Sequence, residues 1–116
     1  MRVSREFTFS GAHRLPEYRG KCERLHGHTW RLRVTVRAPV RAGGIAFDFA
    51  ELDRVVGERV LSTLDHSDLN AVLPDPSAER IAQWVWRALD GLPLEEVRVW
   101  ESDRCFVAYR GEGDDA

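Results

Sequence analysis

The chain has 116 residues, of which 43% are hydrophobic, and a formal net charge of −2. This length suits one domain with a modest core, and the near-zero charge argues against a surface built for nucleic acid or an anionic membrane. No apolar run reaches the roughly 20 residues of a membrane-spanning helix, and the N-terminus lacks a signal-peptide pattern, so we expect a cytoplasmic protein with no membrane partner.

Two long strands are predicted in the first third of the chain. Residues 3–13 place Phe7, Phe9, Gly11 and His13 on one parity. Residues 28–38 alternate regularly, with apolar side chains on one parity and mostly arginine and threonine on the other. The apolar set is Trp30, Leu32, Val34 and Val36. The polar stretch at residues 14–25 contains a proline and a glycine and predicts a loop.

Two helices and two further strands complete the pattern. Asp48 and Glu51 have capping-box spacing before apolar residues at helical intervals, which predicts a helix over residues 48–63. A second apolar stripe predicts a helix over residues 77–90, ended by Gly91 and Pro93. Strands are expected over residues 95–102 and 104–110. The order ββααββ predicts an α+β domain over residues 1–111, with two helices on one face of a four-stranded antiparallel sheet, and a short acidic tail at 112–116.

Three of the four histidines are candidates for a metal site. His26 and His28 are two residues apart, so in a strand their side chains project from one face, and His13 lies on the expected neighbouring strand. Three imidazoles with an open fourth position are typical of catalytic zinc. Zinc is favoured by the all-imidazole set, and copper, nickel and iron are also compatible with these ligands.

Cys22 lies in the polar loop four residues before His26, next to Lys21 and Arg24. Positive neighbours lower a thiol pKa and favour the reactive thiolate, so Cys22 is a candidate catalytic group. The alternative is an inert core thiol. Cys105, in the last predicted strand, has no such neighbours and is expected to pack in the core.

Three further residues combine charge with a suggestive position. Asp65 precedes His66, and a carboxylate beside an imidazole can orient it for proton transfer. The alternative is a histidine that interacts with the dipole at a helix C-terminus. Glu101 shares the parity of the apolar residues of its predicted strand, and a carboxylate on a buried face requires a cationic or multi-donor partner.

Six segments, taken in order, resemble the 6-pyruvoyl-tetrahydropterin synthase family over roughly residues 3–111, most closely its bacterial 6-carboxy-tetrahydropterin synthase branch. They are Phe9-Ser10-Gly11-Ala12-His13-Arg14-Leu15, Cys22-x3-His26-Gly27-His28, Gly44-Ile45-Ala46-Phe47-Asp48-Phe49, Leu64-Asp65-His66-x2-Leu69-Asn70, Pro76-Ser77-Ala78-Glu79, and Glu101-Ser102 with Tyr109-Arg110-Gly111.

The resemblance implies a tunnelling fold, in which subunits join their sheets into a barrel, and a homohexamer built as a dimer of trimers with pterin sites between subunits. It also implies the roles of individual residues. These are Zn²⁺ on His13, His26 and His28, Cys22 as the proton-abstracting base, Asp65 and His66 as a relay pair, and Glu101, Ser77 and Ala78 as substrate-binding residues, with Glu101 on the guanidine-like edge of the pterin.

The implied activity is a zinc-dependent lyase that converts 7,8-dihydroneopterin triphosphate to 6-carboxy-tetrahydropterin, on the route to queuosine. Glu23 keeps an enzymatic alternative open, because a sister group uses a glutamate near that position to release 6-hydroxymethyl-dihydropterin for folate synthesis. A non-catalytic pterin- or metal-binding module is the alternative from another class, and the presence of both the thiol and the relay pair argues against it.

Overall fold

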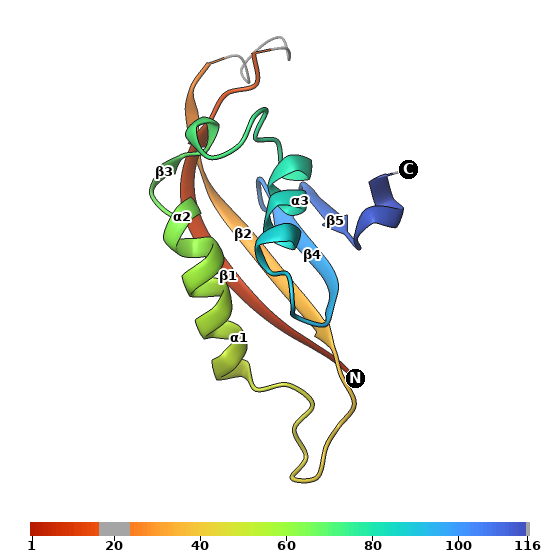
Figure 1. Cartoon of the computed structure of the whole chain (residues 1–116). Coiled ribbons are helices and arrows are strands. Elements are labelled where there is room, and N and C mark those ends of the chain that lie inside the picture. Colours follow the sequence, from red (N-terminus) through yellow and green to blue (C-terminus); the bar gives the residue numbers. More distant parts are fainter. Residues whose placement is uncertain (17–23, 116) are drawn as a thin grey trace.

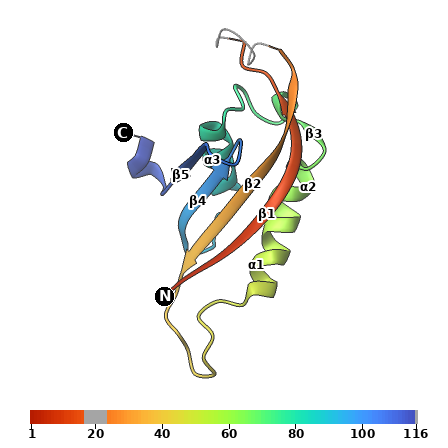
Figure 2. The same ribbon diagram turned by 180° about the vertical axis from the view of Figure 1, so that it is seen from behind.

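The computed structural model describes residues 1–16 and 24–115. Its centre is a sheet with the strand order β3-β1-β2-β4-β5 (Figure 1). The strands are β1 (Arg2–His13), β2 (His26–Arg37), β3 (Ser67–Asp68), β4 (Leu94–Trp100) and β5 (Phe106–Tyr109). The helices are α1 (Phe49–Val56), α2 (Ser62–Leu64) and α3 (Ala78–Ala88). All three helices lie on one face, and the view from behind shows the other face of the sheet without a helix (Figure 2).

The sheet differs from the prediction in one strand. Four of its strands pair in antiparallel fashion as expected, but the short β3 adds a fifth strand, parallel to β1. Ser67 pairs with Gly11 and Asp68 with Ala12. The prediction of a purely antiparallel four-stranded sheet was therefore wrong. Two residues are too few for a pattern of hydrophobic alternation, so the sequence carried no signal for this strand.

The first helix is also less regular than predicted. The expected helix over residues 48–63 divides into α1, a π-helical turn over Gly57–Leu61, and α2. Both long helices begin at side-chain caps: Asp48 accepts the N–H of Ala50, and Ser77 accepts the N–H of Arg80. The acidic tail forms a 3₁₀ turn over Glu112–Asp115. Within the described residues, no helix is long and apolar enough to span a membrane.

The core lies between the sheet and the helices. Alternate residues of the three central strands are buried toward the helices, as their parity predicted, and burial of each such side chain contributes about 1.5–3 kcal/mol. They are Phe7, Phe9, Trp30, Leu32, Val34, Val36, Val97 and Val99. Gly11 interrupts this row because a Cβ there would lie 3.0 Å from the side chain of Leu69. The close packing of Leu69 on β1 therefore depends on glycine at this position.

The cap of α1 gives a test of this local structure. Asp48→Ala removes the acceptor for the N–H of Ala50, and we expect it to lower the free energy of unfolding by about 1 kcal/mol. Asp48→Asn is the matched control, because asparagine caps a helix about as well as aspartate. Urea unfolding at one fixed protein concentration measures both. An equal loss in the two variants would assign the effect to the charge rather than to the cap.

Candidate metal centre and relay pair

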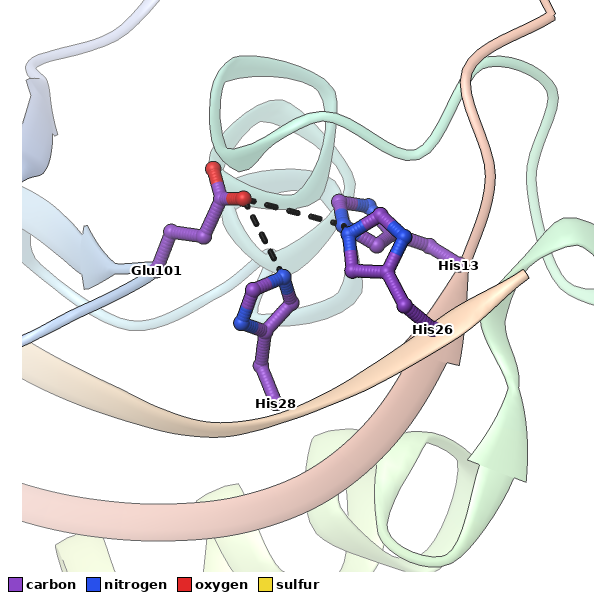
Figure 3. Close-up of side chains that lie close together, drawn as sticks. All are labelled: His13, His26, His28 and Glu101. Carbon is purple, nitrogen blue, oxygen red and sulfur yellow. Dashed lines mark hydrogen bonds and ion pairs between the residues drawn. The ribbon is translucent and has the colours of Figure 1, made fainter. Parts of the chain in front are cut away.

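Three histidines meet where β1 ends and β2 begins. In the antiparallel register His13 pairs with His26, and Gly11 pairs with His28. This pairing brings all three imidazoles to the helix-bearing face, and Figure 3 shows them pointing toward one another. The ring centroid of His13 lies 4.5 Å from that of His26 and 5.1 Å from that of His28. The predicted convergence of the three side chains is confirmed.

Trp30 packs against two of these rings from the core side. It is fully buried, and its ring centroid lies 5.0 Å from that of His13 and 5.3 Å from that of His28, in edge-to-face contacts. Its indole N–H donates to the carbonyl of Gly11 at 3.1 Å. The indole is therefore held by the neighbouring strand and restricts the two imidazoles from the core side.

Two backbone carbonyls orient the histidine rings. His13 donates from Nδ1 to the carbonyl of Pro76 at 2.7 Å, and His26 donates from Nδ1 to the carbonyl of Arg24 at 2.7 Å. A proton on Nδ1 leaves the lone pair on Nε2, which is the arrangement that second-shell carbonyls give to metal-binding histidines. Both Nε2 atoms point into the same space, 3.0 Å apart.

The spacing of the donor atoms fits a tetrahedral ion. Glu101 adds a carboxylate, with Oε1 3.2 Å from Nε2 of His28 and 3.7 Å from Nε2 of His13 (Figure 3). The four donor atoms lie within 4.8 Å of one another. Ligands about 2.0–2.1 Å from a tetrahedral zinc ion lie about 3.3 Å apart, so these distances suit a bound metal. The cluster can therefore hold a metal ion.

The electrostatics of His28 also suit metal binding. Its Nε2 is shielded from solvent and makes no hydrogen bond to the described residues, and it lies 3.2 Å from the Glu101 carboxylate. Burial is the main cause that lowers the pKa of His28, and His13 and His26 lower it further, whereas Glu101 opposes them. A lowered pKa keeps the imidazole neutral at neutral pH, and a neutral imidazole is the form that binds a metal.

Asp65 and His66 form a second polar site beside the edge of β1. Oδ1 of Asp65 accepts the backbone N–H of Ser10 at 2.9 Å and contacts Nδ1 of His66 at 3.1 Å. The hydrogen bond from Ser10 is the largest cause that lowers the pKa of Asp65, and His66 adds to it. The aspartate is therefore an anchored anion in contact with the imidazole of His66.

His66 is presented to solvent by the backbone. Its φ is 57°, in the left-handed region, its N–H donates to the carbonyl of Ser10, and its side chain is 82% exposed. It lines a hollow of about 430 Å³ together with Ser10, Thr29 and His28, one of the three clustered histidines.

The remaining predicted site residues have mixed outcomes. Cys22 and Glu23 lie outside the described residues. Ser77 caps α3, and Ala78 is buried in its first turn, next to the carbonyl that holds His13. Cys105 is exposed, so its predicted core packing was wrong. The reason is that β5 begins at Phe106, so Cys105 lies in the turn between β4 and β5.

Some contributions to the site were not foreseen. Glu101 was placed inside a strand, but β4 ends at Trp100 and the carboxylate reaches the histidines from the following turn. The orienting carbonyls of Pro76 and Arg24 had no signal in the sequence, because every residue carries a carbonyl and only the fold selects these two. The sequence placed Trp30 on the apolar parity of its strand, which predicted core packing but not its contacts with the histidines.

The chain is similar to known proteins over nearly its whole length. A sequence model of the family described as 6-pyruvoyl tetrahydropterin synthase matches residues 2–112. A 6-carboxy-5,6,7,8-tetrahydropterin synthase of Synechocystis is 38% identical, with 93% of this chain and 90% of that protein covered. A dihydroneopterin monophosphate aldolase of Pyrococcus furiosus is 34% identical, with 91% and 94% covered. The solved 6-pyruvoyl tetrahydropterin synthase of Caenorhabditis elegans superposes with a TM-score of 0.88 at 26% identity, over 97% of this chain and 96% of that one.

The metal centre can be tested by removing one ligand. We expect His28→Ala to bind metal much more weakly, because it removes one of three imidazole donors and leaves His13 and His26 with only the Glu101 carboxylate beside them. His66→Ala is the matched control, since His66 lies outside the cluster, and it should keep the metal content of the natural chain. Elemental analysis after gel filtration measures both. Full metal occupancy in His28→Ala would remove His28 from the ligand set.

Proposed function

The chain belongs to the 6-pyruvoyl tetrahydropterin synthase family, and on this premise we propose that it is a zinc-dependent lyase acting on 7,8-dihydroneopterin triphosphate. Several relatives are named 6-carboxy-5,6,7,8-tetrahydropterin synthase, so the chain is a lyase of that type. The proposed product is 6-carboxy-tetrahydropterin, and the proposed pathway leads to 7-deazaguanine compounds such as queuosine.

The observation that carries this proposal is the convergence of three imidazole nitrogens, with the rings of His13 and His26 each fixed by a backbone carbonyl. Carbonyl-oriented imidazoles are suited to zinc, and a three-histidine set leaves a coordination position for substrate. Bound zinc would supply Lewis-acid polarisation of the vicinal hydroxyls on the pterin side chain. His13, His26 and His28 are the residues that would hold it.

Proton transfer would fall to residues outside the metal cluster. In the proposed reaction the Cys22 thiolate removes a proton from the substrate side chain, and His66 returns one. Asp65 holds the imidazole in position through a carboxylate that is itself fixed by the N–H of Ser10. A histidine held in one orientation is suited to general acid–base catalysis.

Glu101 has to move if it anchors the pterin. Its carboxylate lies 3.2 Å from Nε2 of His28, among the metal donors. The pterin side chain and the amino-pyrimidinone edge lie at opposite ends of a two-ring system, so one carboxylate cannot contact the metal donors and the far edge at once. The proposed anchoring role therefore requires the Glu101 side chain to leave the histidines when substrate binds.

The enzymatic alternative is the side-chain aldolase reaction that yields 6-hydroxymethyl-dihydropterin. It is favoured by the presence of Glu23 and by similarity to the aldolase of Pyrococcus furiosus. The Cys22-x3-His26 spacing matches the carboxy-forming branch, which is why we place this reaction second.

A complete site is proposed to require more than one copy of the chain. The three histidines cluster on the helix-bearing face, and His66 lies outside that cluster with its side chain 82% exposed. The sheet also has open edges in the described residues: β5 has no outer neighbour, and β3 covers only two residues of β1. Open edges favour strand pairing between copies, which supports a homohexamer with sites between subunits.

The reaction and its base can be tested together. Purified protein incubated with dihydroneopterin triphosphate should give 6-carboxy-tetrahydropterin, identified by mass. If Cys22 is the base, Cys22→Ala should lower turnover by about two to four orders of magnitude, the usual cost of losing a positioned general base. Metal content should be unchanged, because the thiol is not a ligand.

Glu23→Gln is the matched control for Cys22→Ala, and it should retain most of the activity. The reason is that the Cys22-x3-His26 spacing of the carboxy-forming branch assigns the base to Cys22 rather than to Glu23. The opposite result, with Glu23→Gln inactive, Cys22→Ala active and a hydroxymethyl product, would establish the aldolase reaction instead.

Assembly is tested by light scattering coupled to gel filtration. At micromolar concentration the chain should have the mass of a homo-oligomer, and we expect a hexamer. The physical reason is the cost of leaving unpaired strand edges in water-accessible positions. A monomeric mass under these conditions would contradict sites built between subunits.

A further inference from the structure

The uncovered face of the sheet carries an ordered grid of side chains. Along one cross-strand row Thr8, Arg31, Trp100 and Phe106 are neighbours, and along the next row Glu6, Arg33, Arg98 and Ala108 are neighbours. These outward positions belong to none of the sites described above. Arginines at such outward positions are mostly exposed to solvent.

Arg31 is instead packed flat against an aromatic ring. Its guanidinium carbon lies 3.9 Å from the ring centroid of Trp100, which is only 5% exposed. Arg31 has no acidic partner among the described residues, and its Nε is buried without a hydrogen bond there. Stacking on an indole holds a guanidinium in one plane and leaves its outer N–H groups available to an acceptor.

Two more arginines surround the same indole. The guanidinium carbons of Arg33 and Arg98 lie 5.2 and 5.9 Å from the Trp100 ring centroid, and these two residues are direct cross-strand partners. Like charges placed directly opposite in a sheet destabilise it. Three cations around one ring are therefore an arrangement that needs compensating negative charge.

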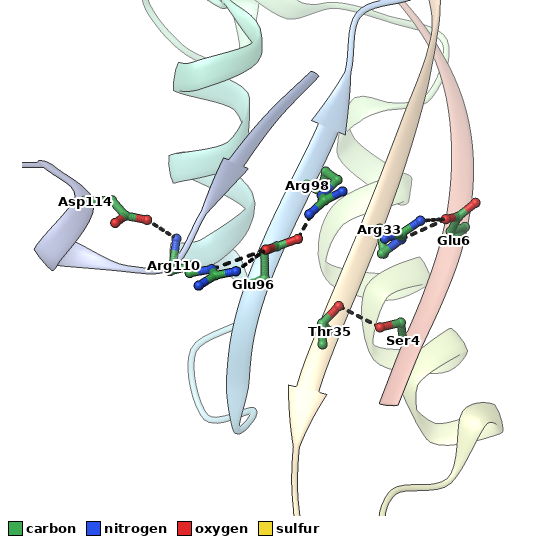
Figure 4. A network of polar contacts seen from close by, with 8 residues as sticks. All are labelled: Ser4, Glu6, Arg33, Thr35, Glu96, Arg98, Arg110 and Asp114. Carbon is green, nitrogen blue, oxygen red and sulfur yellow. Dashed lines mark hydrogen bonds and ion pairs between the residues drawn. The ribbon is translucent and has the colours of Figure 1, made fainter. Parts of the chain in front are cut away.

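The nearby carboxylates do not supply enough of it. Glu6 pairs with Arg33 at 2.7 Å, and Glu96 is shared between Arg98 at 2.9 Å and Arg110 at 3.3 Å (Figure 4). Four guanidinium groups are thus matched by two carboxylates, and Arg31 is the member of the group with neither.

We propose that this cluster, formed by Arg31, Arg33 and Arg98 around Trp100, binds an oligophosphate. Guanidinium forks match phosphate oxygens in geometry as well as in charge, and a multiply charged small anion can satisfy several forks at once. The proposed function, on which this choice of anion rests, both takes a triphosphate ester as substrate and releases its phosphate chain. Oligomerisation through strand edges would leave this face uncovered by protein and bring several copies of the cluster together.

The test is equilibrium dialysis of the full chain against inorganic tripolyphosphate at low ionic strength, where charge interactions are least screened. The natural chain should bind saturably. Arg31→Gln should weaken binding by about tenfold or more, the usual scale for a lost charge-assisted contact. Arg31→Lys keeps the charge but loses the planar fork, so it should bind with intermediate affinity and covers the case in which Arg31→Gln fails to fold.

Arg54→Gln is the matched control, because Arg54 is an exposed arginine on α1 engaged by Glu51 and Glu58, and it removes the same charge. It should bind like the natural chain. Zinc is measured in both compartments so that metal extracted by phosphate is not counted as binding. GTP is dialysed in parallel: equal affinity assigns recognition to the phosphates alone, and tighter binding of GTP assigns it to the phosphates of a nucleotide.

Equal binding by Arg31→Gln and the natural chain would overturn the proposal. So would the absence of saturable tripolyphosphate binding, or saturable binding of a single-stranded oligonucleotide only. The measurement needs no turnover, so failure of the proposed reaction leaves it interpretable.

Discussion

The antiparallel register between β1 and β2 is the constraint on which the metal centre depends. Pairing of His13 with His26 places a histidine from each strand at the same level of the sheet, and the two-residue period adds His28 on the same face. A shift by one residue would turn the set on one strand to the opposite face. The hydrophobic row that ends in Trp30 fixes this register, so the stability of the core and the geometry of the site share one cause.

The two faces of the sheet carry different groups of polar side chains. The helix-bearing face holds the imidazole cluster under cover of α3 and its preceding segment, whose Pro76 carbonyl orients His13. The uncovered face holds the arginine grid around Trp100. A single layer of backbone lies between the faces. The proposed assembly of several copies of the chain would give the open strand edges a partner.

In the proposed reaction, Glu101 connects substrate binding to the candidate metal site. In this structure its carboxylate adds a fourth donor to the three histidines. A ligand that attracts this carboxylate away would expose a coordination position for itself. Its position in the turn after β4, rather than inside the strand, gives the side chain room for such a movement.

The sequence alone determined much of this protein. Alternation predicted β1 and β2 and the face on which their histidines lie. Capping residues predicted where α1 begins, an apolar stripe predicted α3, and six motifs predicted the family. These features are local, and local periodicity is encoded by neighbouring residues. Only the tertiary structure decided the two-residue strand β3, the exposure of Cys105, the carbonyls that orient His13 and His26, and the stacking of Arg31 on Trp100. Each of these depends on residues distant in the chain meeting in space, or on where a strand ends, and a pattern along the chain contains neither.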